Sequence, residues 1–192
     1  MRRLDRYTSV AILLHWLIAA LIAANVGLAW YFNTQHGLAK LGPLQIHKSI
    51  GITVLVLSLA RLLWRFTATP PPLPTSMNRL EKLAAHAVHA LLYAIMIGMP
   101  LTGWATASAS KLIKVAPITW FGLFKWPAID RLANLPPAPM KQAHDLFDGL
   151  HSDGAWVIYV LVAGHVAAAL WHRFGRGDAV LWRMAPIGPK PA

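Results

Sequence analysis

The sequence predicts an all-α integral membrane protein, a four-helix bundle with both termini on the cytoplasmic side. Of its 192 residues, 56% are hydrophobic and only 13% are charged, whereas about a quarter of the residues of a soluble domain are charged. Four apolar segments approach or exceed the ~20 residues that a helix needs to cross the hydrocarbon core. Nine histidines accompany only seven acidic residues. We therefore treat residues 1–192 as one transmembrane domain.

The four expected spans cover about residues 8–32, 46–66, 81–107 and 150–173. The first follows the basic segment MRRLDR and has no small-residue cleavage site at the right distance, so we interpret it as a retained anchor. The run PPPLP at residues 70–74 cannot continue a helix and separates the second and third spans. Five prolines mark residues 108–141 as a long loop before the fourth span.

The lysines and arginines predict the orientation, because cytoplasmic loops carry an excess of them. Eleven fall on the side of the termini and seven on the other side. The first set is Arg2, Arg3, Arg6, Arg61, Arg65, Arg79, Lys82, Arg173, Arg176, Arg183 and Lys190. The second set is Lys40, Lys48, Lys111, Lys114, Lys125, Arg131 and Lys141. This asymmetry places both termini in the cytoplasm.

The composition also limits the chemistry. The chain has no cysteine, which excludes disulfides, thiolate-bound clusters and cysteine nucleophiles. The net charge of +11 is typical of nucleic-acid binders, but here the basic residues punctuate apolar segments. We therefore expect membrane lipid and an anionic substrate as partners, and no nucleic acid. No phosphate-binding glycine motif and no hydrolase triad is present, so we assign no catalytic residue.

The histidines form two pairs when each is placed by its depth in the membrane. His15 lies about seven residues into the first span, and His165 lies about eight residues before the cytoplasmic end of the fourth. Both are therefore ~10–12 Å from the cytoplasmic face. His47 opens the second span, and His151 lies at the outer end of the fourth. Each histidine thus has a partner at the same depth in another span.

The spacing between His151 and His165 predicts what these pairs hold. Fourteen residues rise ~21 Å and complete nearly four turns, so both imidazoles lie on one face of the helix. In a chain without cysteine, neutral imidazole is the strong axial ligand for haem iron. We predict two b haems inside the bundle, one held by His15 and His165 and the other by His47 and His151.

The remaining histidines leave alternatives open. His89 has nearly the depth of His15 and is the rival ligand. His172 lies seven residues after His165, at the cytoplasmic boundary. A titratable imidazole there suits a quinone headgroup, which needs a hydrogen-bond donor and a proton; the alternative is an ordinary interfacial residue. We expect His36 and His144 in outer polar loops.

Several motifs in order resemble the bacterial cytochrome b561 family. They are LHW at 14–16, HKSIG at 47–51, RLLWR at 61–65, HxxHxxxY at 86–93, HVAAALxHRF at 165–174 (with His172 inside it) and RMxP at 183–186. The resemblance covers nearly the whole chain. The family comprises four-helix di-haem membrane cytochromes, and its members include superoxide oxidases.

The resemblance implies the ligands, the substrates and the location. The family's axial ligands correspond to His15, His47, His151 and His165, in agreement with the depth argument. Its ubiquinone site corresponds to the start of the third span together with His172. The residues at that start are Arg79, Leu80, Glu81, Lys82 and Leu83. The implied location is the bacterial inner membrane, crossed several times.

The resemblance also implies a donor. In superoxide oxidases, superoxide gives an electron at the outer haem and quinone is reduced near the cytoplasmic side. Five basic residues of the long loop would concentrate such an anion near the outer haem. They are Lys111, Lys114, Lys125, Arg131 and Lys141. The alternative is a solvated loop that contacts lipid headgroups or an acidic redox protein.

We therefore expect a superoxide:ubiquinone oxidoreductase with two haem b groups. The first alternative is a cytochrome b anchor subunit that takes electrons from a protein partner in a hydrogenase- or dehydrogenase-type complex. The second is a histidine-based metal or proton transporter. A transporter would need carboxylates within the spans, and none of the seven acidic residues lies deep in one.

Overall fold

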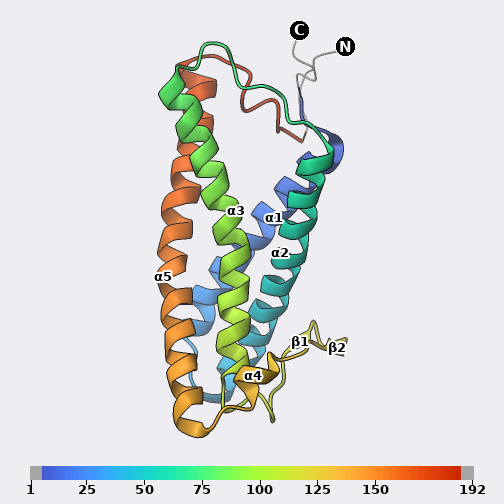
Figure 1. Cartoon of the computed structure of the whole chain (residues 1–192), viewed down its shortest axis with the longest axis vertical. Helices are drawn as coiled ribbons and strands as arrows, with labels where there is room; N and C mark the ends of the chain where they lie inside the picture. Colours follow the sequence, from blue (N-terminus) through green and yellow to red (C-terminus); the bar gives the residue numbers. More distant parts are fainter. Residues whose placement is uncertain (1–5, 187–192) are drawn as a thin grey trace.

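The computed structural model describes residues 6–186, and it is mostly helical. Four helices are long and apolar enough to cross a membrane: α1 (Ser9–Asn33), α2 (Leu41–Thr67), α3 (Arg79–Ser108) and α5 (Pro137–Leu170) (Figure 1). Shorter elements connect or extend them: η1 (Gly37–Lys40), the hairpin of β1 (Thr119–Trp120) and β2 (Phe124–Lys125), α4 (Asp130–Ala133) and η2 (Trp171–Gly175). The predicted fold class, a helical membrane bundle, is confirmed.

The surface of the bundle is apolar along the length of the helices. The most hydrophobic stretches of the four helices have mean hydropathies of 1.5 to 2.1, yet only 6–22% of their residues are buried within the protein. Leu13, Leu63 and Val160 are each about two-thirds or more exposed, at 66%, 67% and 71%. Such a surface suits lipid, where helices satisfy their own backbone hydrogen bonds.

Local sequence signals set the helix ends. The Thr8 side chain accepts a hydrogen bond from the backbone of Ala11 and caps α1, and Asn78 forms a reciprocal capping box with Glu81 at the start of α3. α5 begins at Pro137, 13 residues before the predicted start of the fourth span at 150. Proline is tolerated at the first helical position, where the N–H has no partner in any case. The prolines at 137 and 139 therefore begin the helix, whereas we expected them in the loop.

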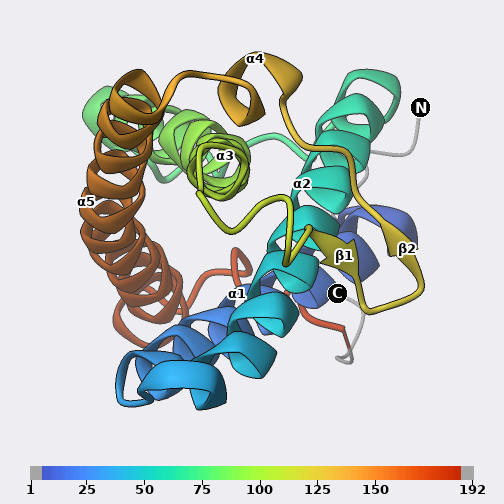
Figure 2. The same ribbon diagram turned by 90° about the horizontal axis from the view of Figure 1, so that it is seen from below.

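The helices associate as two pairs. α1 packs against α2, α3 packs against α5, and α2 also contacts α3. Seen from below, α3 and α5 lie on one side and α1 and α2 on the other (Figure 2). Gly154 allows α3 and α5 to approach, because a Cβ atom at this position would overlap the Met99 side chain.

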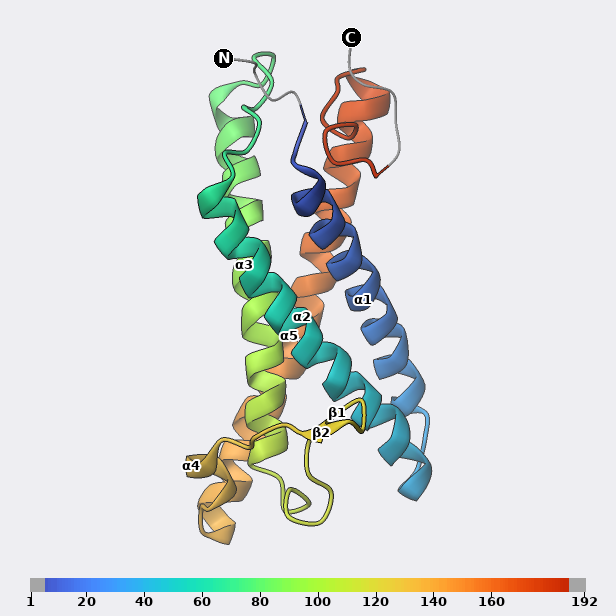
Figure 3. The same cartoon turned by 90° about the vertical axis from the view of Figure 1, so that its right-hand side faces the viewer.

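Residues 109–136 form a packed cap at one end of the bundle, which we call the outer cap (Figure 3). Its hairpin turns through Phe121 and Gly122, which have φ of +47° and +74°. The Ser49 hydroxyl on α2 donates to the Thr119 carbonyl at 2.9 Å and accepts from the Phe121 N–H at 2.9 Å. Ile118 is only 1% exposed within the apolar cluster beneath the cap. The long loop of the sequence is therefore anchored on α2.

The first and last described residues meet at the opposite end, which we call the terminal end. The Tyr7 N–H donates to the Arg183 carbonyl at 3.2 Å, and the Trp16 indole N–H donates to the Met184 carbonyl at 2.7 Å. Arg2, Arg3 and Lys190, which entered the orientation argument, lie outside the described residues. Which end faces the cytoplasm stays a prediction.

Candidate functional site

The outer pair, His47 on α2 and His151 on α5, faces across the bundle. Their ring centroids are 6.1 Å apart and their planes are nearly perpendicular, at 82°. Nδ1 of His47 lies 3.3 Å from the Asn25 carbonyl, and Nδ1 of His151 lies 3.0 Å from the Met99 carbonyl. Because a carbonyl only accepts, each Nδ1 carries the proton and each Nε2 keeps its lone pair. This is the tautomer of a metal ligand oriented by its other ring nitrogen.

α3 shapes the space around His151. A Cβ atom at Gly103 would lie 2.9 Å from Cε1 of His151, so only glycine leaves the ring in this position without a shift. The Thr102 hydroxyl donates to the Met99 carbonyl at 2.8 Å, and its oxygen lies 3.1 Å from Nδ1 of His151. Together these contacts fix both the position and the tautomer of His151.

The spacing of the outer pair fits two axial ligands of one iron. Two imidazoles that bind a first-row metal from opposite sides, each through a bond of about 2 Å, have ring centroids about 6 Å apart. The observed 6.1 Å agrees with this. The tautomers, the spacing and the glycine beside the ring all suit a haem.

The inner cluster contains three histidines, His15 on α1, His89 on α3 and His165 on α5. The ring centroid of His165 lies 6.2 Å from that of His15 and 5.6 Å from that of His89. The structure thus brings the predicted pair together, and it also brings the rival ligand to the same partner. Both pairings of His165 satisfy the distance criterion.

Arg61 distinguishes His15 from the other histidines. Its Nη1 lies 2.9 Å from Nδ1 of His15, and its guanidinium carbon lies 5.7 Å from the Tyr93 ring centroid. A guanidinium only donates, so Nδ1 of His15 accepts and the proton is on Nε2. For Nε2 to bind iron, the proton must move to Nδ1 and Arg61 must withdraw its N–H. Sequence reasoning used Arg61 for topology and missed this contact.

The start of α3 and the end of α5 are joined by an ion pair. Glu81 accepts two hydrogen bonds from Arg176, at 2.5 and 3.1 Å. This pair connects the predicted quinone residues at 79–83 with the turn that contains His172. Leu80 and Leu83 are 77% and 66% exposed, so this region also presents an apolar surface to lipid.

His172 has a carboxylate partner that the sequence did not reveal. Its Nδ1 lies 2.5 Å from Oδ2 of Asp178, and their side chains are only 12% and 17% exposed. The other oxygen of Asp178 accepts the Val180 N–H at 3.0 Å. The one available signal was that Asp178 is among only seven acidic residues and lies six positions after His172.

A cavity of about 450 Å³ opens between α2, α3 and the proline-rich segment. Lys82, His86 and His89 line it together with Arg65 and Tyr7. It therefore connects one predicted quinone residue, Lys82, with the inner cluster. Its lining does not include His172, so the predicted quinone residues divide between this cavity and the turn with Asp178.

A family model described as prokaryotic cytochrome b561 matches residues 6–186, almost the full chain. The chain belongs to the prokaryotic cytochrome b561 family. Membership shows a membrane electron-transfer protein and implies haem b binding. The resemblance drawn from the motifs is thereby confirmed.

Three relatives align over nearly their whole length. Cytochrome b561 homolog 2 of Escherichia coli (strain K12) is 33% identical over 184 residues, which cover 94% of this chain and 91% of the relative. Cytochrome b561 homolog 1 of the same organism is 27% identical, with coverages of 95% and 98%. The probable superoxide oxidase CybB of Yersinia pestis is 28% identical, with coverages of 94% and 96%.

The basic residues of this cytochrome b561 at the outer cap are not equivalent. Lys111, Lys114, Lys125 and Arg131 are exposed. Lys141 lies on α5 and pairs with Asp145 one turn later. Only the first four therefore contribute an unneutralised positive charge among the residues of the expected loop.

Proposed function

We propose that this cytochrome b561 transfers electrons from superoxide to ubiquinone through two b haems. The observation that carries the proposal is the pair of histidine groups at two depths of one bundle. Each group has a ring spacing, 6.1 Å for the outer pair and 6.2 or 5.6 Å for the inner cluster, that suits axial ligation of one iron.

The outer haem would be held by His47 and His151, and the inner one by His165 with His15, for which His89 is the rival. Bound haem b supplies an iron that accepts and donates single electrons. The chain fixes the ligands: the Asn25 and Met99 carbonyls orient the outer imidazoles. α5 carries one ligand of each group, and 14 residues of helix separate them by ~21 Å.

The proposed donor is superoxide at the outer cap. Lys111, Lys114, Lys125 and Arg131 expose positive charge there, and such charge raises the encounter rate of a small anion. The relationship to the probable superoxide oxidase of Yersinia pestis supports this donor. Superoxide that gives up one electron leaves as dioxygen, and no proton is exchanged at this end.

The proposed acceptor is ubiquinone at the terminal end. Reduction of one quinone to quinol takes two electrons, from two superoxide anions, and two protons. His172 is the proposed proton donor: Asp178 accepts from its Nδ1, and its Nε2–H would donate one proton at a time, whenever the imidazole is protonated. The Glu81–Arg176 ion pair joins the start of α3 to the turn that contains this histidine.

We also propose that the terminal end faces the cytoplasm and the outer cap the periplasm of a bacterial inner membrane. The excess of lysine and arginine on the terminal side supports this orientation.

A cytochrome b anchor subunit is the second candidate, and the hairpin favours it. Leu123 and Phe124 are 74% and 51% exposed next to Lys125, a combination that suits contact with a redox protein. In that case electrons would enter from a protein and not from superoxide.

The deciding assay mixes purified protein with superoxide and a soluble ubiquinone analogue. We expect quinone reduction well above the uncatalysed rate, with two superoxide anions consumed per quinol. Full haem content with quinone reduction no faster than background would favour the anchor subunit instead.

A further inference from the structure

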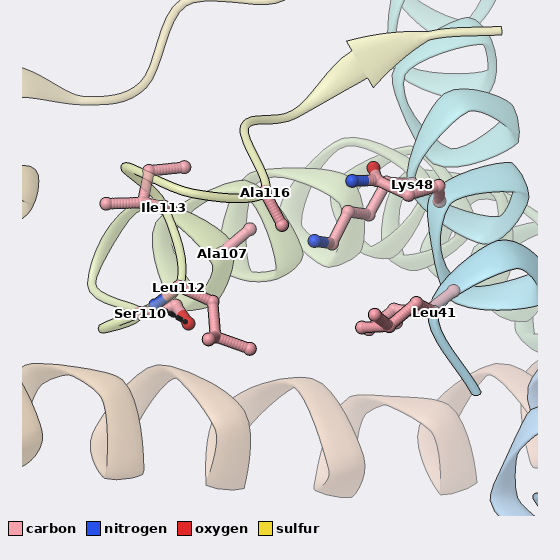
Figure 4. Close-up of a pocket in the computed structure, with 9 residues that line it drawn as sticks. Leu41, Lys48, Ala107, Ser110, Leu112, Ile113 and Ala116 are labelled. Carbon is pink, nitrogen blue, oxygen red and sulfur yellow. Dashed lines mark hydrogen bonds between the residues drawn. The ribbon is translucent and has the colours of Figure 1, made fainter. Parts of the chain in front are cut away.

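A small cavity lies between the first turns of α2 and the chain that follows α3 (Figure 4). Its volume is about 70 Å³, enough for a ligand of only a few atoms. Most of its walls are apolar. Three side chains bring polar atoms to it: Gln45, Lys48 and Ser110. We call it the Lys48 cavity.

Lys48 supplies the charge of this cavity. Its side chain extends from α2 toward Ala107 and Ala116 (Figure 4). No carboxylate lines the cavity, and within residues 6–186 no ion pair includes Lys48. A cation between apolar walls attracts an anion more strongly than the same cation in water.

The two other polar side chains contribute one acceptor and one donor. The Gln45 amide N–H donates to the Pro117 carbonyl at 3.0 Å, and its Oε1 is buried without a partner among the described residues. The Ser110 oxygen accepts the Leu112 N–H at 3.2 Å, which leaves its O–H available to donate. An ammonium has three donors, enough for Oε1 of Gln45 and for an anion.

The position of the cavity relates it to the outer pair. Lys48 directly follows His47, and Ala107 lies one helical turn, ~6 Å, beyond Gly103, which contacts His151. The cavity therefore lies just beyond the outer pair, toward the cap.

We propose that the Lys48 cavity is a binding site for a small inorganic anion. Resting on the proposed function, that anion is superoxide: it would dock at the Lys48 ammonium, beside the haem that His47 and His151 would hold, and that haem would supply the one-electron acceptor. After giving up its electron, superoxide would leave as neutral dioxygen, which the ammonium no longer attracts. The exposed cations of the cap raise the encounter rate, whereas Lys48 holds the anion at the point of transfer.

The first test needs no turnover and uses bromide as the probe. Crystals of the haem-loaded protein soaked in bromide should show anomalous scattering beside Lys48. The peak should be lost in Lys48→Gln and retained in Lys48→Arg, which keeps the charge. A peak of equal height in Lys48→Gln, or no peak at Lys48 in the unaltered protein, would overturn the site.

The second test measures the rate with superoxide. Lys48→Gln should lower the second-order rate constant at least tenfold, Lys48→Arg should recover most of it, and all variants should keep their haem spectra. Lys125→Gln removes the same charge from the exposed hairpin and is the matched control, with an expected loss below threefold. Equal losses in Lys48→Gln and Lys125→Gln would show general steering and reject docking at Lys48.

The two tests separate the two proposals. A Lys48-dependent bromide peak in a protein that does not oxidise superoxide would reject the donor and keep the anion site. Rapid superoxide oxidation that is unchanged in Lys48→Gln would keep the donor and reject the site.

Discussion

The outer pair and the inner cluster differ in how their imidazoles are held and protonated for binding an iron. At the outer pair, two backbone carbonyls accept the Nδ1 protons of His47 and His151, so both Nε2 atoms already have the protonation of a ligand. At the inner cluster, the His165 ring lies close to both His15 and His89. Arg61 donates a hydrogen bond to Nδ1 of His15, so this Nδ1 accepts, whereas the Nδ1 atoms of the outer pair donate. The outer site is therefore preorganised, while ligation by His15 requires a proton shift and a side-chain movement.

The two sites should respond differently to an electron. We expect the outer pair, whose imidazoles are held by helix carbonyls, to change little when the haem proposed between them is reduced. A site with a third imidazole and a guanidinium nearby can alter its hydrogen bonds as an electron arrives. The inner cluster also adjoins the cavity that includes Lys82. Proton-linked chemistry is therefore expected at the terminal end and simple electron entry at the outer cap.

The largest effect is expected from removing one ligand of each group. His151→Ala should lose the outer haem and keep the inner one, and His165→Ala should do the reverse, because each is the proposed ligand of a different iron. Haem per protein, measured as the pyridine haemochrome, should fall from two to one in each case. Two haems retained in both variants would contradict the ligand assignment.

The next effect separates the two candidates that face His165. If His15 is the ligand, as we predicted from depth, His15→Ala should lose the inner haem. His89→Ala should then retain it, because this change would remove only a polar neighbour of the haem and not a ligand. The reverse pattern would assign the ligand to His89 and give His15 and Arg61 the role of a hydrogen-bonded pair beside it.

An intermediate effect is expected at Gly103. Gly103→Val places branched carbon where even a Cβ would lie 2.9 Å from the His151 ring, so the ring must shift. The affinity for the outer haem should fall about 10- to 100-fold, as it does for other changes that disturb the support of a metal ligand. Gly98→Val on the same helix is the control, since a Cβ there meets nothing within 4 Å. Equal haem loss in both variants would indicate a general effect on α3.

The smallest effect is expected at Asp178, which acts through His172. In Asp178→Ala the imidazole loses its orienting acceptor, and quinone reduction should slow about tenfold. Asp178→Asn keeps an oxygen acceptor and should recover much of the rate. The reduction of the haems by the donor should stay unchanged in both. A fall in haem reduction as well would point to a purely structural role at the end of α5.

The sequence alone was sufficient for the four helices and for the depth-matched histidines. Long apolar runs must be helical in lipid, and helical rise converts residue number into depth. It was insufficient for contacts made across the bundle, because depth does not determine which faces meet. Arg61 against His15, Asp178 against His172 and Gly103 against His151 are such contacts. The early start of α5 at Pro137 was missed because proline permits both a loop and a first helical turn.

The proposal of two haems per chain, each held by two histidines, is tested most directly by electron paramagnetic resonance of the oxidised, purified protein, combined with its haem content. We predict two haems per chain and two low-spin ferric signals, both typical of iron with two imidazole ligands. One signal should disappear in His151→Ala and the other in His165→Ala. A single haem per chain, or a high-spin signal from an iron with one histidine, would contradict the account.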